Sequence, residues 1–421
     1  MAKLIYNKDG RLLFTKEMKR DYTLLMPQML PVTFTMMKKV FELYGYKVEM
    51  LTTNHRGIVE TGLKYVHNDT CYPALLVIGQ LIEAVNSGIY DKQKIGLLIS
   101  QTGGGCRASN YIHLLRKALE KAGMPHIPVV SVNLSGLERN PGFGLSLPVI
   151  RRLAAAMIYG DIIVWLSNQC KPYEVTPGLS EKLISSWTDK LVELFGRGKG
   201  LRKNEMRVYM DEIAADFAKV DIIGMRNKPR VGIVGEIYVK YAPLGNNGLE
   251  QFLIDEGCEP VVPGLTDFMI FKINNRAVDV DLYSGSKLKK LVVSIFQRYI
   301  EGLQHNMIEA IRTQPVFRPM GTFSDLQHLI RGYLGYGNKM GEGWLLTAEM
   351  LELIHTGTNN IVCTQPFGCL PNHVVGKGMI RRLKDDYPES NIVAIDYDPG
   401  ATKINQENRI KLMIANAERV C

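Results

Sequence analysis

The sequence lacks a long apolar segment that would cross a membrane, and its first residues lack the apolar core of a signal peptide. Its most apolar stretch, Leu153 to Leu166, is interrupted by Asp161 and follows Arg151 and Arg152. That stretch is too short and too charged for a bilayer core of about 30 Å. No basic tail or arm is present, although Lys and Arg outnumber Asp and Glu by 51 to 42. We therefore expect a cytoplasmic protein that binds neither a membrane nor nucleic acid.

Two common nucleotide-binding motifs are also missing. The run Gly103-Gly-Gly105 is not followed by the Gly-Lys-Ser/Thr of a P-loop, and no Gly-x-Gly-x-x-Gly follows an expected strand. Any ATP chemistry would then have to come from a partner chain. The net charge of +9 is scattered. It would favour an anionic ligand, such as a nucleotide or coenzyme A, or an acidic partner.

Length and composition indicate an ordinary globular protein. The 421 residues suggest two or three domains, and they are enough to bury a core without disulfides or metal. The apolar fraction of 46% and charged fraction of 22% exclude wholesale disorder, a collagen-like repeat and a coiled-coil rod. The sequence has no short-period repeat and no low-complexity tract.

Strand-like and helix-like segments alternate in the first part of the chain and again in the last part. The expected strands are 23–26, 47–51, 94–100, 128–132, 229–235, 259–262, 360–364 and 391–395. The expected helices beside them are 33–44, 73–86, 110–121, 247–256, 287–311, 374–384 and 405–417. This alternation predicts an α/β fold of two lobes, each with a mainly parallel sheet covered by helices.

The middle of the chain has a different pattern. Helical spacing dominates from 148 to about 225, including segments 178–195 and 205–220, and one strand-like run, 161–166, interrupts it. We therefore expect a first α/β lobe at 1–147, a mainly helical connecting region at 148–227, and a second α/β lobe with a helical insertion at 228–421.

Three of the seven cysteines fall between an expected strand or loop and the start of a helix. Cys106 follows the strand at 94–100, Cys369 follows the strand at 360–364, and Cys71 directly precedes a helix that begins near Pro73. Ligands bind at the carboxyl ends of parallel strands, and a helix N-terminus favours a thiolate. Three such cysteines from two lobes would suit an iron–sulfur cluster or zinc at the cleft between the lobes.

The other cysteines have less favourable positions. Cys258 lies between a helix and a strand, at the opposite end of the sheet, and Cys421 is terminal. Cys170 follows the strand-like run at 161–166, whereas Cys363 is expected at the end of its strand and is an additional candidate ligand. The spacing Cys363-x5-Cys369-x3-His373 would also allow zinc, but it lacks the Cys-x2-Cys knuckle of structural zinc sites. His373 fits the start of a helix better.

Several motifs together resemble one protein family. They are Asn68-Asp-Thr-Cys-Tyr-Pro73, Gln101-Thr-Gly-Gly-Gly-Cys-Arg107, Gln365-Pro-Phe-Gly-Cys-Leu-Pro-Asn-His373, Asp396-Tyr-Asp-Pro399 and Asn408-Arg-Ile-Lys-Leu412. The chain resembles the C-terminal module of the large activase-related proteins of the 2-hydroxyacyl-CoA dehydratase system, here as a separate chain. The likeness covers essentially the whole sequence. It is similar more distantly to the dehydratase subunits and to the double-cubane cluster reductases.

The resemblance implies two α/β lobes, a helical domain, and an iron–sulfur cluster held between the lobes. Carried over residue by residue, it supports Cys71, Cys106 and Cys369 as ligands of a 4Fe–4S cluster. A double-cubane 8Fe–9S cluster would need about six thiolates by analogy with the family, and recruiting Cys258 for it conflicts with that residue's position. The resemblance further implies low-potential electrons from an actin-like ATPase that carries its own cluster. A homologous subunit or a homodimer and an acyl-CoA are further implied partners.

The reaction itself stays open at this stage. The resemblance allows a component of an ATP-dependent reductase or an acyl-CoA dehydratase, working without oxygen, and equally a non-catalytic cluster carrier or scaffold. Three thiolates would leave one iron open for substrate, whereas Cys363 as a fourth thiolate would favour electron transfer. A zinc-binding protein is the remaining alternative, and no residue is identified as catalytic.

Overall fold

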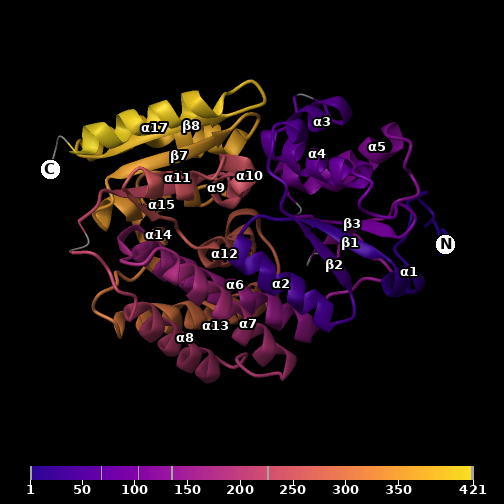
Figure 1. The fold of residues 1–421 in the computed structure, drawn as a ribbon, viewed down its shortest axis with the longest axis horizontal. Coiled ribbons are helices and arrows are strands. Elements are labelled where there is room, and N and C mark those ends of the chain that lie inside the picture. The colour runs from indigo at the N-terminus through magenta and orange to yellow at the C-terminus, as the bar shows by residue number, and fades with distance from the viewer. Residues whose placement is uncertain (1, 68, 103, 134–135, 225–226, 419–421) are drawn as a thin grey trace.

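The computed structural model describes residues 2–67, 69–102, 104–133, 136–224 and 227–418 (Figure 1). Two four-stranded sheets, both parallel throughout, form the centres of two lobes, with strand orders β2-β1-β3-β4 and β6-β5-β7-β8. Helices surround both sheets, which confirms the expected two-lobed α/β class.

The first lobe alternates strands and helices, as expected for parallel pairing. Its strands are β1 (Thr23–Pro27), β2 (Lys47–Leu51), β3 (Ile95–Ser100) and β4 (Val129–Val132). Its helices are α1 (Lys16–Asp21), α2 (Pro31–Leu43), α3 (Gly57–Tyr65), α4 (Tyr72–Asn86) and α5 (Tyr111–Lys121). β3 is buried along five of its six residues because helices cover both faces of the sheet.

The second lobe repeats this arrangement. Its strands are β5 (Arg230–Gly235), β6 (Glu259–Val261), β7 (Asn360–Pro366) and β8 (Asn391–Tyr397). Its helices are α9 (Ile237–Tyr241), α10 (Pro243–Asn246), α11 (Leu249–Asp255), α14 (Phe323–Leu329), α15 (Leu345–His355), α16 (Ile380–Asp386) and α17 (Lys403–Glu418). The helix expected at 247–256 is α11, whereas α9, α10, α14 and α15 were not expected from the sequence.

Both sheets reverse their winding direction at the equivalent position in their strand orders. In each lobe the first strand lies between the second and the third, so the winding reverses between β1 and β3 and between β5 and β7. Open α/β sheets bind ligands beyond the carboxyl ends of the strands at such a reversal. The segments that follow β3, β5 and β7 are therefore the places where each lobe is expected to present binding residues.

A layer of long helices lies beside the two sheets. It contains α6 (Leu147–Cys170), α7 (Leu179–Gly196), α8 (Lys203–Ala218), α12 (Leu265–Tyr283) and α13 (Lys287–Arg312). The strand expected at 161–166 is wrong, because these residues lie inside α6. α6 is buried on nearly all sides along its second half, so its β-branched, apolar run reflects burial rather than a strand. Within the described ranges, none of the helices has the length and apolarity needed to cross a bilayer.

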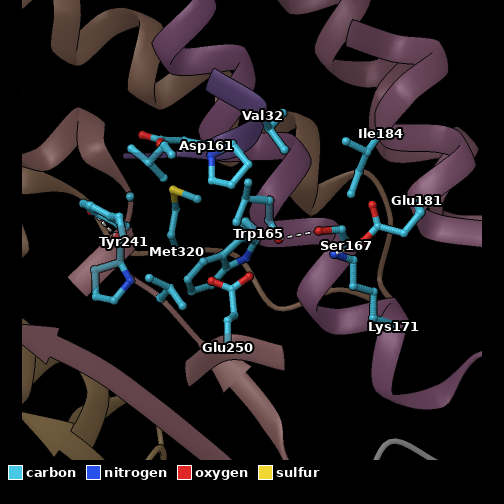
Figure 2. A pocket seen from close by; sticks show the side chains of 16 residues that line it. Val32, Asp161, Trp165, Ser167, Lys171, Glu181, Ile184, Tyr241, Glu250 and Met320 are labelled. Carbon is cyan, nitrogen blue, oxygen red and sulfur yellow. Dashed lines mark hydrogen bonds and ion pairs between the residues drawn. The ribbon is translucent and has the colours of Figure 1, made fainter. Parts of the chain in front are cut away.

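Asp161 shows why a charged residue lies inside this buried helix. Its carboxylate accepts the backbone N–H groups of Leu265, at 3.0 Å, and Thr266, at 2.7 Å, and also the hydroxyl of Thr266. These N–H groups are at the start of α12, so Asp161 caps that helix from a distance. The carboxylate lies at the wall of a cavity of about 190 Å³ between α6 and the loop after β6 (Figure 2).

The two lobes share an apolar core. One continuous cluster of buried side chains joins residues of both sheets and of α4, including Leu25, Leu75, Val231 and Ile395. Between α3 and α4 the backbones touch, because a Cβ at Gly62 would lie 2.3 Å from the carbonyl oxygen of Leu75. The α3–α4 contact lies within the first lobe, whereas the shared apolar cluster joins the two lobes.

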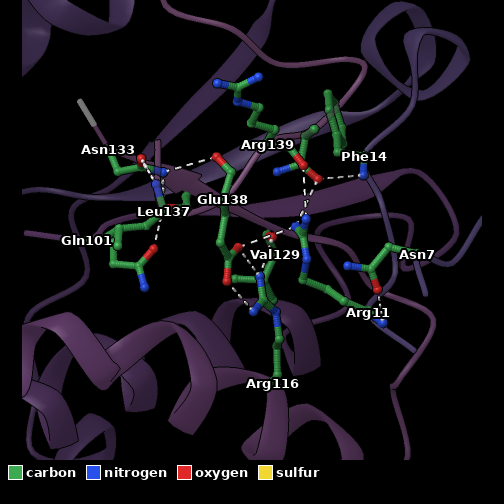
Figure 3. Close-up of polar contacts among 12 residues, drawn as sticks. Asn7, Arg11, Phe14, Gln101, Arg116, Val129, Asn133, Leu137, Glu138 and Arg139 are labelled. Atoms are coloured by element: carbon green, nitrogen blue, oxygen red, sulfur yellow. Dashed lines mark hydrogen bonds and ion pairs between the residues drawn. The ribbon is translucent and has the colours of Figure 1, made fainter. Parts of the chain in front are cut away.

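A partly buried acidic residue holds the start of the chain against the first sheet. Glu138, just beyond β4, accepts two hydrogen bonds from the guanidinium of Arg116 on α5, at 2.8 and 2.6 Å (Figure 3). It also pairs with Arg11 at 3.3 Å, and Arg11 donates to the carbonyl of Arg139. Hydrogen bonds and charges from Arg116 and Arg11 outweigh burial and lower the pKa of Glu138.

We expect the Glu138→Gln variant to lose about 1–2 kcal/mol of unfolding free energy at pH 7, because the two arginines lose their charged partner. A lowered carboxyl pKa stabilises the fold above the usual glutamate range, and this stabilisation disappears as pH falls through the folded-state pKa. The wild-type advantage should therefore shrink on acidification in urea unfolding. Glu60→Gln, at an exposed site, is the matched control. Equal stabilities of the two variants at pH 7 would contradict this role.

Candidate functional site

The three cysteines singled out by the sequence all lie where the two lobes meet. Cys106 is in the loop after β3 and Cys369 in the loop after β7, which are the third strands of their lobes. Cys71 directly precedes α4 and contacts the loop that carries Cys369. Cys71 and Cys369 are buried, whereas Cys106 is half-buried, so the site is nearest to solvent at Cys106.

Cys71 occupies the N-cap position of α4, with extended backbone, ahead of the first-turn proline that the sequence indicated. Its Sγ is 2.8 Å from the hydroxyl oxygen of Tyr111, at the start of α5. The next residue, Tyr72, donates its backbone N–H to the carbonyl of Phe367 in the second lobe, at 2.9 Å. Cys71 is therefore fixed by contacts from both lobes.

Cys106 is held by the polar residues of its own loop. It precedes the short 3₁₀ helix Arg107–Asn110, and the backbone N–H of Ser109 donates to its carbonyl. Gln101 donates to the carbonyl of Ser109 at 3.1 Å and accepts from Ser131 of β4 at 2.9 Å, which ties this loop to the sheet. From the second lobe, a Cβ at Gly341 would lie 4.0 Å from the Cys106 Sγ.

Cys369 begins the segment that follows β7. Its carbonyl accepts the N–H of His373, at the start of an irregular helical stretch through Gly376. His373 itself is exposed and lies in the first turn of that stretch, as the sequence indicated. A Cβ at the preceding Gly368 would lie 3.0 Å from the Cα of Cys71. The Cys369 loop thus packs directly on the start of α4.

Burial is the main cause that raises the pKa of each of the three thiols, and Glu236 contributes to all three. Burial raises the pKa of the Cys71 thiol to about 11, and the charges of Glu236 and Cys106 add to the rise. Burial also raises the pKa of Cys106, with Glu342 and Glu236 contributing. For Cys369, burial and then Glu342, Glu236 and Cys106 raise the pKa far above that of an ordinary thiol. At neutral pH these thiols stay protonated unless a cation binds them.

Two buried glutamates complete the site. Glu236 follows β5 directly and caps α9, accepting the N–H of Val239 at 2.9 Å, while Glu342 accepts the N–H of Ile237 at 3.0 Å. Burial, and then the charge of Glu342, raise the pKa of Glu236 to about 8. Lys272 of α12 donates to the carbonyl of Gly341, and burial lowers the pKa of its ammonium. The site therefore combines three thiols, two carboxyl groups and one lysine in a buried setting.

These polar residues were not identified from the sequence. Glu236 carried a usable signal, since it directly follows an expected strand at the carboxyl end of the sheet. Glu342 lies between two glycines, and Lys272 lies within a helix that was not expected. Neither residue therefore gave a local signal in the sequence. Tyr111 lay at the start of an expected helix, but its contact with Cys71 depends on how α4 and α5 pack together.

The other cysteines lie apart from this site. Cys363 lies inside β7 rather than at its end, fully buried, with its Sγ 3.7 Å from the Asn372 side-chain oxygen. Burial raises its pKa to about 12, and the charges that influence it, Lys377, Asp396 and Glu349, include none of the three site cysteines. Cys258 precedes β6 at the amino end of the sheet, as expected. Cys170 ends α6, not a strand, and Cys421 lies outside the described residues.

The donor set agrees with an iron–sulfur cluster. The three thiols are soft donors, and the segments that carry them reach the site from both lobes, with glycine next to Cys369 and in the Cys106 loop. In the part of the chain that the structure describes, no three Cys, His, Asp or Glu side chains surround a single metal position. A four-iron cluster binds each thiolate at a different iron, so its ligands do not have to meet at one point.

Comparisons with protein-family models and with curated proteins found no match for this chain. The function is therefore argued from the residues of the site itself.

Gly368 provides a test of the contact between the two loops. Its φ of +75° and the close Cα of Cys71 both disfavour a side chain there, whereas a Cβ at Gly88, with φ of +78°, would have no described atom within 4 Å. Both Gly→Ala variants should lose about 1 kcal/mol for the left-handed backbone. Gly368→Ala should lose a further 1–3 kcal/mol or so by displacing the Cys71 backbone. Urea unfolding measures the difference, and equal losses would show that the loops do not press together.

Proposed function

We propose that this protein is an iron–sulfur component of a low-potential reductase or dehydratase system related to that of the 2-hydroxyacyl-CoA dehydratases. The observation that supports this most is that Cys71, Cys106 and Cys369 come from two lobes whose loops meet: a Cβ at Gly368 would lie 3.0 Å from the Cα of Cys71, and a Cβ at Gly341 would lie 4.0 Å from the Cys106 Sγ. The motifs that carry these cysteines are also those that carry the family resemblance.

In this proposal the three thiolates hold a 4Fe–4S cluster between the lobes. The bound cluster would supply one-electron transfer at a potential set by its charge and its hydrogen bonds. Tyr111 would donate its hydroxyl to the Cys71 sulfur, which lowers the negative charge on that ligand. Burial raises the pKa of both Glu236 and Glu342, which favours a proton on these carboxyl groups close to the site.

Three thiolates favour a cluster with one exchangeable iron over a fully ligated one. Cys363 lies inside β7, fully buried, with its Sγ 3.7 Å from the side-chain oxygen of Asn372, and this argues against Cys363 as the fourth ligand. A substrate-binding component, with an acyl-CoA as the substrate class, is therefore our first choice. The alternative is a cluster carrier or scaffold, in which a fourth ligand closes the cluster.

We further propose that an actin-like ATPase with its own cluster reduces this protein in the cytoplasm. Cys106 is the most accessible of the three cysteines, and exposed Arg107 follows it, so the partner is expected to approach the Cys106 loop. Electron transfer weakens steeply with distance, which favours docking there. The net charge of +9 would orient an acidic partner, and salt would weaken that steering.

Metal and sulfide analysis of protein purified without oxygen is the first test. We expect brown protein with iron and acid-labile sulfide each near four per chain, roughly as in other 4Fe–4S proteins. Zinc without sulfide would overturn the proposal in favour of a zinc protein. Reduction of the cluster by the ATPase, with and without ATP, tests the partner. Equal rates in both conditions would exclude ATP-coupled reduction while leaving the cluster assignment intact.

A further inference from the structure

The first half of α13 has its apolar side facing solvent. Six large apolar residues there are 43% to 70% exposed, although they belong to a helix of 26 residues. They form what we call the α13 stripe: Leu288, Leu291, Val292, Ile295, Phe296 and Tyr299. At 100° per residue, they cover one side of the helix. Lys290, Val293, Ser294 and Gln297, on the opposite side, are the partly buried ones.

This orientation is the reverse of that in an ordinary surface helix, which turns its apolar side to the core. The second half of α13 follows the ordinary rule, with Leu303, Met307 and Ile311 buried. α13 lies with α8 in the lower part of Figure 1, in the helical layer away from the sheets. None of the contacts described for the three cysteines involves a residue of the stripe.

The exposed area of the stripe is large enough for a stable interface. With about 200 Å² for each large apolar residue and the exposed fractions above, the stripe presents roughly 700 Å². Single apolar patches on monomeric proteins are typically about 300–600 Å². A standard interface buries about 800 Å² on each partner, so the stripe with its polar rim reaches that size.

We propose that α13 pairs antiparallel with α13 of a second copy of this chain, about a two-fold axis between Val293 and Ser294. In that register Leu288 faces Tyr299, Leu291 faces Phe296, and Val292 faces Ile295 of the partner. Each contact then joins an aliphatic side chain of the first half of the stripe to a larger or equal one of the second half. The stripe is thus complementary to itself, as an isologous interface requires.

Helix orientation favours the antiparallel arrangement over the parallel one. Antiparallel pairing aligns the helix dipoles favourably. Parallel pairing would instead gather Lys287, Lys289 and Lys290 of both copies at one end.

Sedimentation velocity of the full chain tests the proposal. The wild-type protein should sediment as a dimer at micromolar concentration. Ile295→Asp should raise the dissociation constant roughly 100-fold or more, because it buries a charge at the axis. The matched control is Leu412→Asp, at a residue of α17 that is 65% exposed, and it should leave the dimer intact. Thermal unfolding by circular dichroism checks that both variants fold.

A monomeric wild-type protein, or an Ile295→Asp variant as dimeric as the control, would overturn the proposal. Flotation with vesicles rich in anionic lipid that Ile295→Asp abolishes, without any dimer in solution, would identify a lipid surface as the occupant instead. Failure of the dimer would leave the cluster assignment untouched, since metal content is measured independently.

Discussion

Cys106→Ser, Cys71→Ser and Cys369→Ser are each expected to lose most of the iron and sulfide of the anaerobically purified protein. A serine hydroxyl is a harder and far less acidic donor than a thiol, so it binds the soft iron of a cluster weakly. All three thiols also have raised pKa values from burial, so their deprotonation already depends on the bound metal. Removing one ligand should therefore destabilise the cluster as a whole rather than one iron.

Cys258→Ser is the matched control for this series. Cys258 is as fully buried as any cysteine of the described chain, so its replacement also buries a hydroxyl, but it lies at the amino end of β6. We expect wild-type iron content in that variant, and also in Cys421→Ser at the chain terminus. Full cluster retention in Cys106→Ser would show that the junction argument chose the wrong residues.

Cys363→Ser separates the two functional classes. If the protein is a carrier with a fully ligated cluster, this variant should lose iron like the other three. If one iron is open to substrate, Cys363→Ser should keep its cluster, and an acyl-CoA should change the EPR signal of the reduced protein. An unchanged spectrum across a broad acyl-CoA panel would favour the carrier. The position of Cys363 inside β7 leads us to expect retention.

The sequence was most informative where local pattern and global fold agree. Buried parallel strands such as Ile95–Ser100 are short apolar runs followed by glycine, and a cysteine after such a run is at the binding edge of the sheet by topology alone. This is why Cys106 and Cys369 could be placed without a structure. Cys71 could be placed because Pro73 marks the first turn of the helix that follows it.

The errors have one physical cause, which is burial set by the tertiary structure. Residues 161–166 look like a strand because Ile162, Ile163 and Val164 are β-branched, but the second half of α6, a helix of 24 residues, passes through the interior and overrides that preference. α3 was not expected because Gly57 and Gly62 weaken a helical pattern, yet Gly62 is what lets α3 touch α4. Glu342 and Lys272 join the site through long-range packing, which leaves no trace in nearby sequence.

The largest effect on stability is expected at the buried ion pair of Lys240 and Glu349 in the second lobe. Their side chains are 3% and 4% exposed and lie 2.8 Å apart, between α9 and α15. Burial raises the pKa of Glu349, while the charge and hydrogen bond of Lys240 oppose the rise. Lys240→Met should cost about 3–5 kcal/mol of unfolding free energy at pH 8, because a buried carboxylate then lacks a counter-charge.

The pH dependence of that loss has a definite sign. Without Lys240, the folded state would hold a proton on Glu349 that the unfolded state releases above its ordinary glutamate pKa. Unfolding then releases protons, so the stability of Lys240→Met should fall as pH rises from about 5 to 8. The double variant Lys240→Met with Glu349→Gln should recover most of the loss and its pH dependence, because it removes both charges.

An exposed ion pair of the same length provides the control. Lys190 and Glu212 are also 2.8 Å apart, but both side chains are 46% exposed. Lys190→Met should therefore cost about 1 kcal/mol or less, with little pH dependence. Burial raises the pKa of Glu342 and the charge of Lys240 opposes that rise, so the loss of Lys240 should favour a proton on Glu342 at the cysteine site. Equal stabilities of Lys240→Met and Lys190→Met at pH 8 would show that water reaches the Lys240–Glu349 pair. The cysteine site would then not be the dry environment that raises the pKa values of its thiols.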